Sequence, residues 1–180
     1  MSQPKEYYFH SGARFVYRCA GGFFLGMGLL FMLSKFTESD PFSDPDVWFM
    51  LIAGGAFAAV GLWTILFAQW GRISIGEESA KISTWIGRLT VNYSNITSIG
   101  MMIGSVPYSG FRAYMIRKRT GGIPVNLIMR DGGRMAKSCT ISSFERYTEI
   151  IDEFQMRSGE TVQQLSQTAW HEWIQNPTAS

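Results

Sequence analysis

The feature that most constrains this chain is a run of 24 residues without a charged side chain, from Val47 to Trp70. A helix rises about 1.5 Å per residue, so this run is long enough to cross the roughly 30 Å hydrocarbon core of a bilayer. Trp48 and Trp70 stand near its two ends, and indole rings favour the headgroup level. The helix would also be long for the buried core of a soluble domain. The run therefore predicts a transmembrane helix over 47–70.

A second apolar stretch, residues 15–33, comes earlier and is less uniform. Arg18 interrupts it near its start, but an arginine at that depth can extend its guanidinium to the headgroups. The alternative is a cleaved signal peptide. Fourteen polar-rich residues precede the stretch, and Ser34-Lys35-Phe36 lacks the small residues of a cleavage site. We therefore expect a retained transmembrane helix over 15–33.

The segment between the two stretches, residues 34–46, carries four acids and one lysine, and its two prolines disfavour a helix. Arg14 and Arg18 stand at the start of the first stretch, and Arg72 follows the second. Because positive residues favour the cytoplasmic side, the pattern predicts a short acidic external loop. It also predicts that both termini are cytoplasmic, with residues 1–14 as an N-terminal tail.

Small residues recur at a spacing of four in both stretches, and this spacing lets helix backbones approach closely. The first stretch contains Gly22 and Gly26, and the second contains Gly54 and Ala58. These residues are candidate helix-packing positions. The packing partner is either the other span or another subunit.

Beyond Trp70 the hydrophobic period changes from helical to two, which is typical of strands. The sequence predicts three short antiparallel strands, with inward residues Ile73 and Ile75, then Ile82, Thr84 and Ile86, then Leu89, Val91 and Tyr93. Residues 112–119, 125–130 and 134–141 are predicted as further strands, the last two joined by a hairpin turn at Asp131-Gly132-Gly133.

A helix is predicted after the strands. Ser142 and Glu145 have the spacing of a capping box, and Ser158-Gly159 is a stop signal. The residues expected on one apolar face of this helix are Phe144, Tyr147, Ile150, Ile151 and Phe154. Such a face is suited to cover the open end of a small sheet structure.

Three segments carry a resemblance to a known family: RISIGEESAKIS (72–83), GRLTVNYSNITSI (87–99) and the strand-turn-strand-helix segment 127–154. Their turns and apolar positions resemble the bacterial pleckstrin-homology-like (PH-like) membrane proteins, in which two N-terminal spans precede a PH-like domain. The resemblance implies a membrane α+β fold: a two-helix transmembrane hairpin followed by a PH-like antiparallel β-barrel or sandwich, residues 71–157, capped by a C-terminal helix. It also implies the bacterial cytoplasmic membrane as the location.

Positive charge gathers in the predicted domain, which has 12 Lys and Arg against 7 Asp and Glu over residues 71–157. The densest group consists of Arg112, Arg117, Lys118 and Arg119. These residues are candidates for contact with anionic lipid headgroups or with an acidic partner. The alternative is a solvated strand end that follows the positive-inside bias. Nucleic acid is not expected as a partner, because the segment lacks an aromatic stacking motif.

The C-terminal tail, residues 158–180, is expected to contain a short amphipathic helix, because Thr161 and Gln164 again have capping-box spacing. Trp170 and Trp173 would be exposed on this helix and are candidate anchors. They would rest on the chain's own domain, at the membrane interface or on a partner subunit.

No catalytic pattern emerges from the sequence. His10 and His171 are the only histidines, and neither has a Cys or acid at ligand spacing, so neither a metal nor another cofactor is expected. The expected function is therefore that of a non-catalytic accessory, scaffold or assembly subunit of a membrane complex. Its partners would be the bilayer and another membrane protein or a second copy of the chain. The alternative is a membrane-anchored PH-like module that recognises anionic lipid headgroups.

Overall fold

The structure is a computed structural model that describes residues 3–36, 45–104, 110–131 and 134–166. The chain divides into two compact units. One comprises residues 14–70 and is helical, and the other comprises residues 1–13 together with 71–180 and contains the strands. We call them the helical unit and the β unit.

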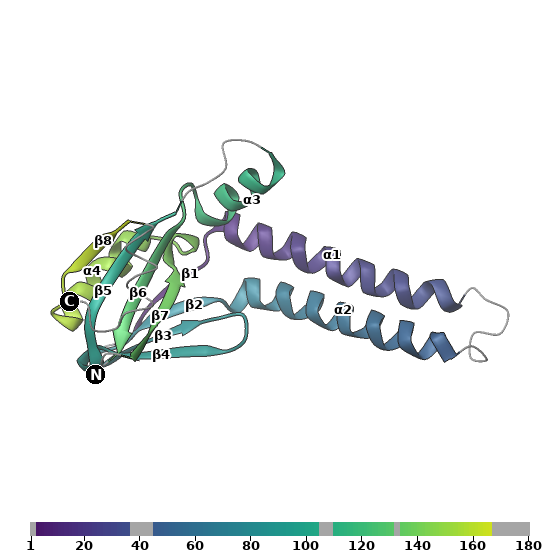
Figure 1. The fold of residues 1–180 in the computed structure, drawn as a ribbon, viewed down its shortest axis with the longest axis horizontal. Coiled ribbons are helices and arrows are strands. Elements are labelled where there is room, and N and C mark those ends of the chain that lie inside the picture. Colours follow the sequence, from purple (N-terminus) through teal and green to yellow (C-terminus); the bar gives the residue numbers. More distant parts are fainter. Residues whose placement is uncertain (1–2, 37–44, 105–109, 132–133, 167–180) are drawn as a thin grey trace. The chain divides into compact units, whose positions relative to one another are not determined.

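The helical unit is built from two long apolar helices, α1 (Ser11–Phe36) and α2 (Pro45–Trp70), shown in Figure 1. Stretches of 24 residues in each, Ser11–Ser34 and Val47–Trp70, are long and apolar enough to cross a membrane. The prediction of two long apolar helices is therefore confirmed.

Glycines bring the two helices into backbone contact. A Cβ atom added to Gly28 would lie 2.5 Å from the backbone nitrogen of Ala58 and 2.5 Å from the carbonyl oxygen of Gly54. A Cβ atom on Gly21 would lie 2.6 Å from the carbonyl oxygen of Gly61. These distances leave no room for a side chain, so α1 and α2 pack through glycines.

Of the packing positions expected from the sequence, Gly54 and Ala58 lie at this contact, opposite Gly28. Gly22 and Gly26 do not, because a Cβ atom on either would have no neighbouring atom within 4 Å. The reason is helical periodicity. Gly21 and Gly28 are seven residues apart and share a face, whereas Gly22 and Gly26 are rotated away from it.

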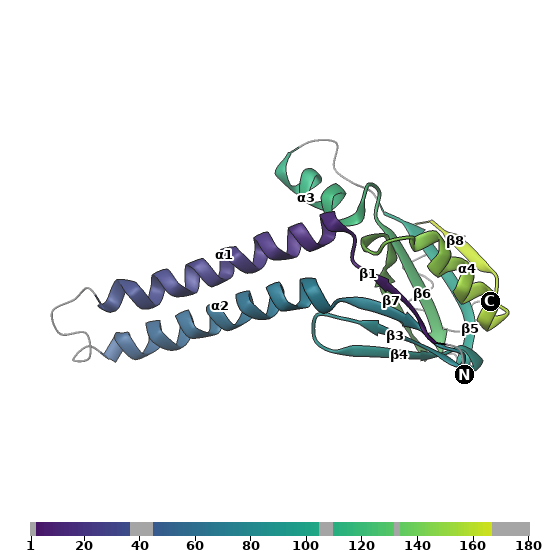
Figure 2. The same ribbon diagram turned by 180° about the vertical axis from the view of Figure 1, so that it is seen from behind.

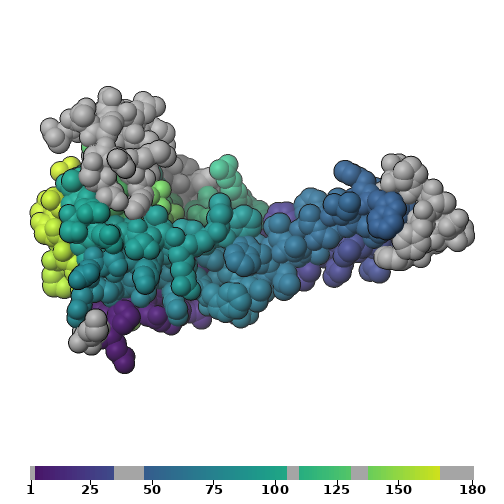
Figure 3. Space-filling view, turned by 90° about the horizontal axis from the view of Figure 1, so that it is seen from below, coloured from purple at the N-terminus to yellow at the C-terminus, as the bar shows by residue number. Residues whose placement is uncertain are grey.

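Large apolar side chains cover the outside of the helical unit. Phe49 and Ile52 are 72% and 70% exposed, and Phe23, Leu30 and Trp70 are also exposed. The space-filling view shows bulky side chains of α2, in blue, along its surface (Figure 3). Soluble proteins rarely expose continuous apolar surface on this scale.

The first sheet of the β unit is antiparallel, with strands in the order β1-β2-β3-β4. Its strands are β1 (Lys5–Tyr8), β2 (Arg72–Ile75), β3 (Ser79–Ser83) and β4 (Arg88–Asn92). The three antiparallel strands predicted after residue 71 are confirmed. Ile73, Ile75, Ile82 and Val91 are buried, which agrees with the period-two pattern.

The prediction that Thr84 and Ile86 face inward is wrong. Both are exposed, Ile86 by 89%, because β3 ends at Ser83 and backbone hydrogen bonds between Thr84 and Gly87 form the turn to β4.

Strand β1 lies within residues 1–14, for which the sequence predicts only a tail. Tyr7 pairs with Ile73 and Tyr8 with Arg72, so β1 and β2 are adjacent although 63 residues separate their facing ends. The helical hairpin is therefore an insertion between two neighbouring strands of one sheet.

The second sheet has the order β7-β6-β5-β8 and contains β5 (Ile96–Ile103), β6 (Val125–Asp131), β7 (Arg134–Thr140) and β8 (Val162–Leu165). The neighbours β5–β6 and β6–β7 are antiparallel, whereas β8 runs parallel to β5 (Figure 2). The predicted tail helix is thus wrong for residues 162–165, which form a strand. Edge pairing to β5 satisfies backbone groups that an isolated short helix would leave exposed to water.

Helix α4 (Tyr147–Ser158) buries Ile150 and Phe154 and ends at Gly159, which has φ +74°, as its stop signal predicts. The expected capping box is wrong. The Ser142 hydroxyl accepts a hydrogen bond from the backbone N–H of Val125 at 2.9 Å, and residues Ile141–Ser143 form a 3-10 turn. The helix therefore starts later, and Phe144 stacks on Phe9 with ring centroids 4.6 Å apart.

Candidate functional site

The basic cluster identified in the sequence lies on a helix, α3 (Phe111–Thr120), and not on the predicted strand. Ala113 and Thr120 are buried, and with the half-buried Ile116 they recur at helical spacing. Gly121 ends the helix with φ +68°, and the Thr120 hydroxyl donates a hydrogen bond to the carbonyl oxygen of Ile116 at 2.9 Å. Alanine, methionine, arginine and lysine favour helices, so local propensity agrees with this outcome.

Three of the four cations lie in the last turn of α3, where positive charge complements the helix dipole. Arg112, Arg117 and Lys118 are exposed, whereas Arg119 is half-buried. Phe111 and Tyr114 are exposed on the same helix. The surface of α3 thus combines cations with aromatic rings.

Arg119 differs from the other cations because its Nε atom is buried and has no hydrogen-bond partner in the part of the chain that the structure describes. Arg119 lines a cavity of about 310 Å³ together with Ile103, Ile116, Pro124 and Asn126. The Asn126 Oδ1 atom accepts a hydrogen bond from the Thr140 hydroxyl at 2.7 Å.

The end of α3 packs against the start of α1, within the β unit. A Cβ atom on Gly12 would overlap the carbonyl oxygen of Lys118, so only glycine fits there. His10 caps the first turn of α1. Its Nδ1 atom accepts hydrogen bonds from the backbone N–H groups of Gly12 at 3.0 Å and Ala13 at 3.3 Å. Burial lowers the pKa of His10, which favours the neutral ring that this cap requires. The end of the basic helix therefore lies against the first turn of α1, at Gly12.

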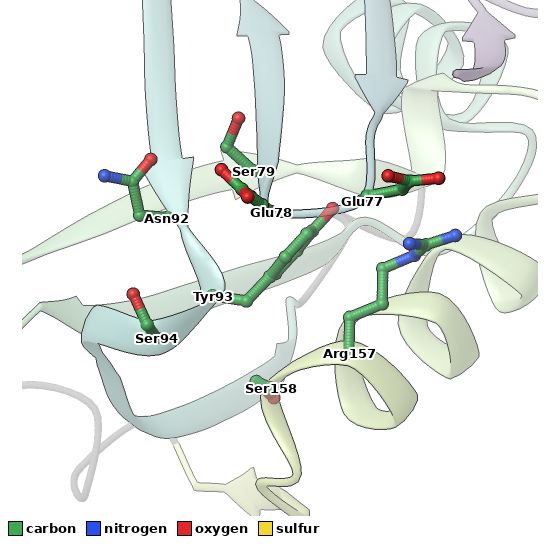
Figure 4. Close-up of a pocket in the computed structure, with 8 residues that line it drawn as sticks. All are labelled: Glu77, Glu78, Ser79, Asn92, Tyr93, Ser94, Arg157 and Ser158. Atoms are coloured by element: carbon green, nitrogen blue, oxygen red, sulfur yellow. The ribbon is translucent and has the colours of Figure 1, made fainter. Parts of the chain in front are cut away.

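A polar pocket of about 550 Å³ lies elsewhere in the β unit (Figure 4). Three elements form it: the turn between β2 and β3, the end of β4 with the following 3-10 turn, and the end of α4. We call it the Tyr93 pocket. Its lining residues are Glu77, Glu78, Ser79, Asn92, Tyr93, Ser94, Arg157 and Ser158.

Backbone hydrogen bonds hold the walls of the Tyr93 pocket together. The N–H of Tyr93 donates to the carbonyl oxygen of Glu78 at 3.0 Å, and Ser79 pairs with Asn92 in the sheet register. The N–H of Gly76 donates to the carbonyl oxygen of Ser79 at 2.9 Å, which closes the turn that carries both glutamates. The pocket is thus formed by regular secondary structure and a closed turn.

Tyr93 is 4% exposed, and its ring packs edge-on against Phe154 with centroids 5.9 Å apart. Among the described residues its hydroxyl group has no hydrogen-bond partner. Burial raises the pKa of Tyr93 to about 12, so the phenol keeps its proton at neutral pH.

Arg157 belongs to an ion-pair network behind the pocket. Its Nε atom donates to Glu153 Oε2 at 2.8 Å, and Lys5 Nζ of strand β1 contacts the other oxygen of this carboxylate. Glu153 is only 5% exposed, and the hydrogen bond from Lys5 holds its pKa below the usual range. The ion pair between Lys5 and Glu153 therefore links strand β1 to helix α4.

The sequence alone did not identify the Tyr93 pocket. It did place Tyr93 among the inward-facing strand residues, which its burial confirms. Nothing local in the sequence indicates that the end of α4 lies beside Glu77 and Glu78. Trp170 and Trp173, the candidate anchors, lie outside the described residues.

Over the described ranges, no group of three or more His, Cys, Asp and Glu side chains is arranged to hold a metal ion. The polar groups that the structure does bring together are suited to binding: a basic, partly aromatic helix surface and an acidic pocket with a buried phenol.

No protein-family model matches the chain, and neither the curated proteins nor the solved structures contain a match. The resemblance to PH-like membrane proteins therefore stays a prediction.

Proposed function

We propose that this chain is a non-catalytic integral membrane protein that serves as an accessory, scaffold or assembly subunit of a membrane complex. In this proposal α1 and α2 span the bacterial cytoplasmic membrane, and the β unit is a PH-like domain that contacts a partner protein on the cytoplasmic side. The two sheets and helix α4, which strand β8 follows, support the β-domain part of this proposal.

The observation that carries the proposal is the insertion of the helical hairpin between β1 and β2. Only Phe9 and His10 separate β1 from α1, and only Gly71 separates α2 from β2. A Cβ atom on Gly71 would overlap the ring of Phe9, so these connections are packed. Short connections of this kind would keep a domain near the membrane surface, which suits a subunit that presents a binding surface there.

The exposed apolar side chains of α1 and α2 support membrane insertion, because a soluble protein would bury them. Extraction of membranes with alkaline carbonate tests this step. We expect the full chain to stay in the membrane pellet, and its release into the supernatant would contradict integral insertion.

Purification of the tagged full chain in a mild detergent tests the subunit role. We expect a stoichiometric partner whose recovery falls when Arg112, Arg117 and Lys118 are replaced by Glu. The control is Lys81→Glu, an exposed cation on β3. Recovery of the chain alone, or equal loss of the partner in the control, would refute a subunit that binds its partner through α3.

A second candidate function, contact with anionic lipid headgroups, is favoured by the surface of α3. Exposed Phe111 and Tyr114 accompany its cations, and its last turn packs on Gly12, in the first turn of α1. Each cation near an anionic leaflet gains on the order of 1 kcal/mol.

Hydrogen exchange of the full chain in lipid nanodiscs tests this second function. We expect slower exchange of α3 when anionic phosphatidylglycerol is added to phosphatidylcholine. The same triple substitution should abolish the difference, and Lys81→Glu should preserve it. Equal exchange in both lipid compositions would exclude recognition of anionic lipid by α3.

A further inference from the structure

The Tyr93 pocket holds a buried hydroxyl group for which the described residues supply no partner. Figure 4 shows this hydroxyl pointing toward the side of the pocket where Glu77 and Arg157 lie. A buried hydroxyl without a hydrogen bond costs about 1–3 kcal/mol. Its position at the pocket therefore points to a ligand that completes its hydrogen bonding.

The charges around the pocket favour a cationic ligand. Glu78 supplies a carboxylate, and Arg157 is the cation among the lining residues. The Nε atom of Arg157 already donates to Glu153. The carboxylate of Glu78 would therefore repel an anion and attract a cation.

Helix α4 adds to this preference, because it ends at Ser158 on the rim of the pocket. The carbonyl end of a helix carries partial negative charge and favours cations. The neutral phenol of Tyr93 adds an oxygen lone pair that accepts an N–H group, and its own proton remains available to an acceptor.

We propose that the Tyr93 pocket binds an organic cation that carries N–H donors, namely an alkylammonium or guanidinium group. The group donates to the Tyr93 oxygen and to the carboxylate of Glu78 in the β2–β3 turn. It comes either from a free amine or from a lysine or arginine side chain of a partner protein. The volume of about 550 Å³ leaves room for a small amine or for a side chain with its neighbouring backbone. This assignment does not depend on membrane insertion.

Calorimetric titration of the full chain in detergent with n-butylammonium tests the proposal. Two variants remove one group each while keeping its shape: Tyr93→Phe keeps the ring against Phe154, and Glu78→Gln keeps the side-chain length. The control is Glu149→Gln, an exposed acid in the first turn of the same helix α4. We expect one saturable site that each pocket variant weakens by about tenfold, the usual effect of losing a hydrogen bond to a charged group.

The site is located by the ¹³Cζ resonance of Tyr93, assigned by its loss in Tyr93→Phe. We expect this resonance to shift with the same saturation curve in the original chain and in Glu149→Gln. Equal affinity in all variants would overturn the proposal. Binding of tetramethylammonium, which lacks N–H donors, with the same affinity would also overturn it. If inorganic phosphate shifted the Tyr93 resonance and n-butylammonium did not, the proposal that the ligand is a cation would be overturned.

A blocked tetrapeptide containing lysine distinguishes the two sources. Tighter binding of the peptide than of n-butylammonium, with the same loss in Tyr93→Phe, assigns the cation to a partner protein. Equal or weaker binding of the peptide assigns it to a free amine.

Discussion

His10 is the residue whose protonation state matters most for how the chain enters α1. Its neutral Nδ1 atom accepts two backbone N–H groups at the start of the helix, and its burial lowers its pKa from the ordinary 6.5. Protonation converts Nδ1 into a donor and removes the cap.

We therefore expect the cap to stabilise the β unit fully above pH 6.5, the unfolded pKa. This stabilisation is lost as the pH falls through the lower folded pKa of His10. His10→Ala should cost about 1 kcal/mol at pH 8, the typical value of a helix cap, and less at pH 5. Thermal unfolding in detergent at the two pH values measures this difference.

His10→Asn provides the control, because its amide oxygen accepts the same N–H groups and does not titrate in this range. Its stability should match that of the original chain at pH 8 and exceed it at pH 5. An NMR titration that places the pKa of His10 above 6.5 would contradict the neutral cap.

Tyr7 shows how a residue outside every predicted element can hold a domain together. It is 2% exposed on β1, and Arg146 lies 5.5 Å from its ring centroid. The described residues provide no hydrogen-bond partner for its hydroxyl group. Its ring, and not its oxygen, should therefore supply the stabilisation.

We expect Tyr7→Ala to lower the unfolding free energy by about 3–5 kcal/mol, as for other large aromatic residues truncated in a core. Tyr7→Phe should be neutral or stabilising, because it removes an unsatisfied polar group. Denaturant unfolding measures both. A small effect of Tyr7→Ala, similar to that of the half-buried Tyr8→Ala, would contradict the role of β1 as an integral strand.

At the scale of elements, the hairpin of α1 and α2 depends on glycines that the four-residue spacing identified only in part. Gly28→Ile places a side chain against the backbone of Ala58, so the helices must separate. Overpacking of this kind typically costs about 1–3 kcal/mol. Unfolding of the full chain by SDS titration should show this loss.

Gly22→Ile is the matched control, because its side chain enters open space on the same helix. It should leave the hairpin as stable as in the original chain. Equal destabilisation by the two substitutions would show that helix propensity, and not the contact with α2, is responsible.

The elements that sequence patterns predicted well are those whose partners are local. The strands around Ile73, Ile82 and Val91 form consecutive hairpins, so alternation alone locates them. Residues 112–119 were predicted as a strand, but they belong to helix α3. The glycines at 110 and 121 that flank it were the better signal. Strands β1 and β8 pair with strands that are distant in sequence, and no local sequence pattern predicts such pairing.

The same distinction explains the candidate site. Arg112, Arg117 and Lys118 are adjacent or nearly adjacent in sequence, so their clustering was visible without a structure. The Tyr93 pocket joins a turn, a strand end and a helix end that are up to 81 residues apart, from Glu77 to Ser158. These groups come together only when the β unit folds.

At the scale of the whole molecule, the pairing of β1 with β2 restricts how the chain can cross a membrane. Tyr8 faces Arg72 in the sheet, α1 begins three residues after Tyr8, and α2 ends two residues before Arg72. One folded sheet cannot have strands on both sides of a bilayer. If the helices are inserted, the hairpin must therefore start and end on the same side.

We expect positions 5 and 81 to lie on the cytoplasmic side and position 39 on the opposite side. The experiment uses a chain with Cys19→Ser and Cys139→Ser and adds one cysteine at a time, as Lys5→Cys, Lys81→Cys or Ser39→Cys. A membrane-impermeant maleimide applied to intact cells should label only Ser39→Cys. Permeabilised cells provide the control, in which all three variants should react.

The pattern of labelling separates the two parts of this prediction. Labelling of both Lys5→Cys and Lys81→Cys in intact cells, with Ser39→Cys protected, would reverse the orientation inferred from the positive residues and leave the sheet intact. Labelling of Lys5→Cys without Lys81→Cys would place β1 and β3 on opposite sides, which the β1-β2-β3 order of the sheet forbids. That result would exclude the fold itself, because no rearrangement of the helices can then preserve the pairing of Tyr8 with Arg72.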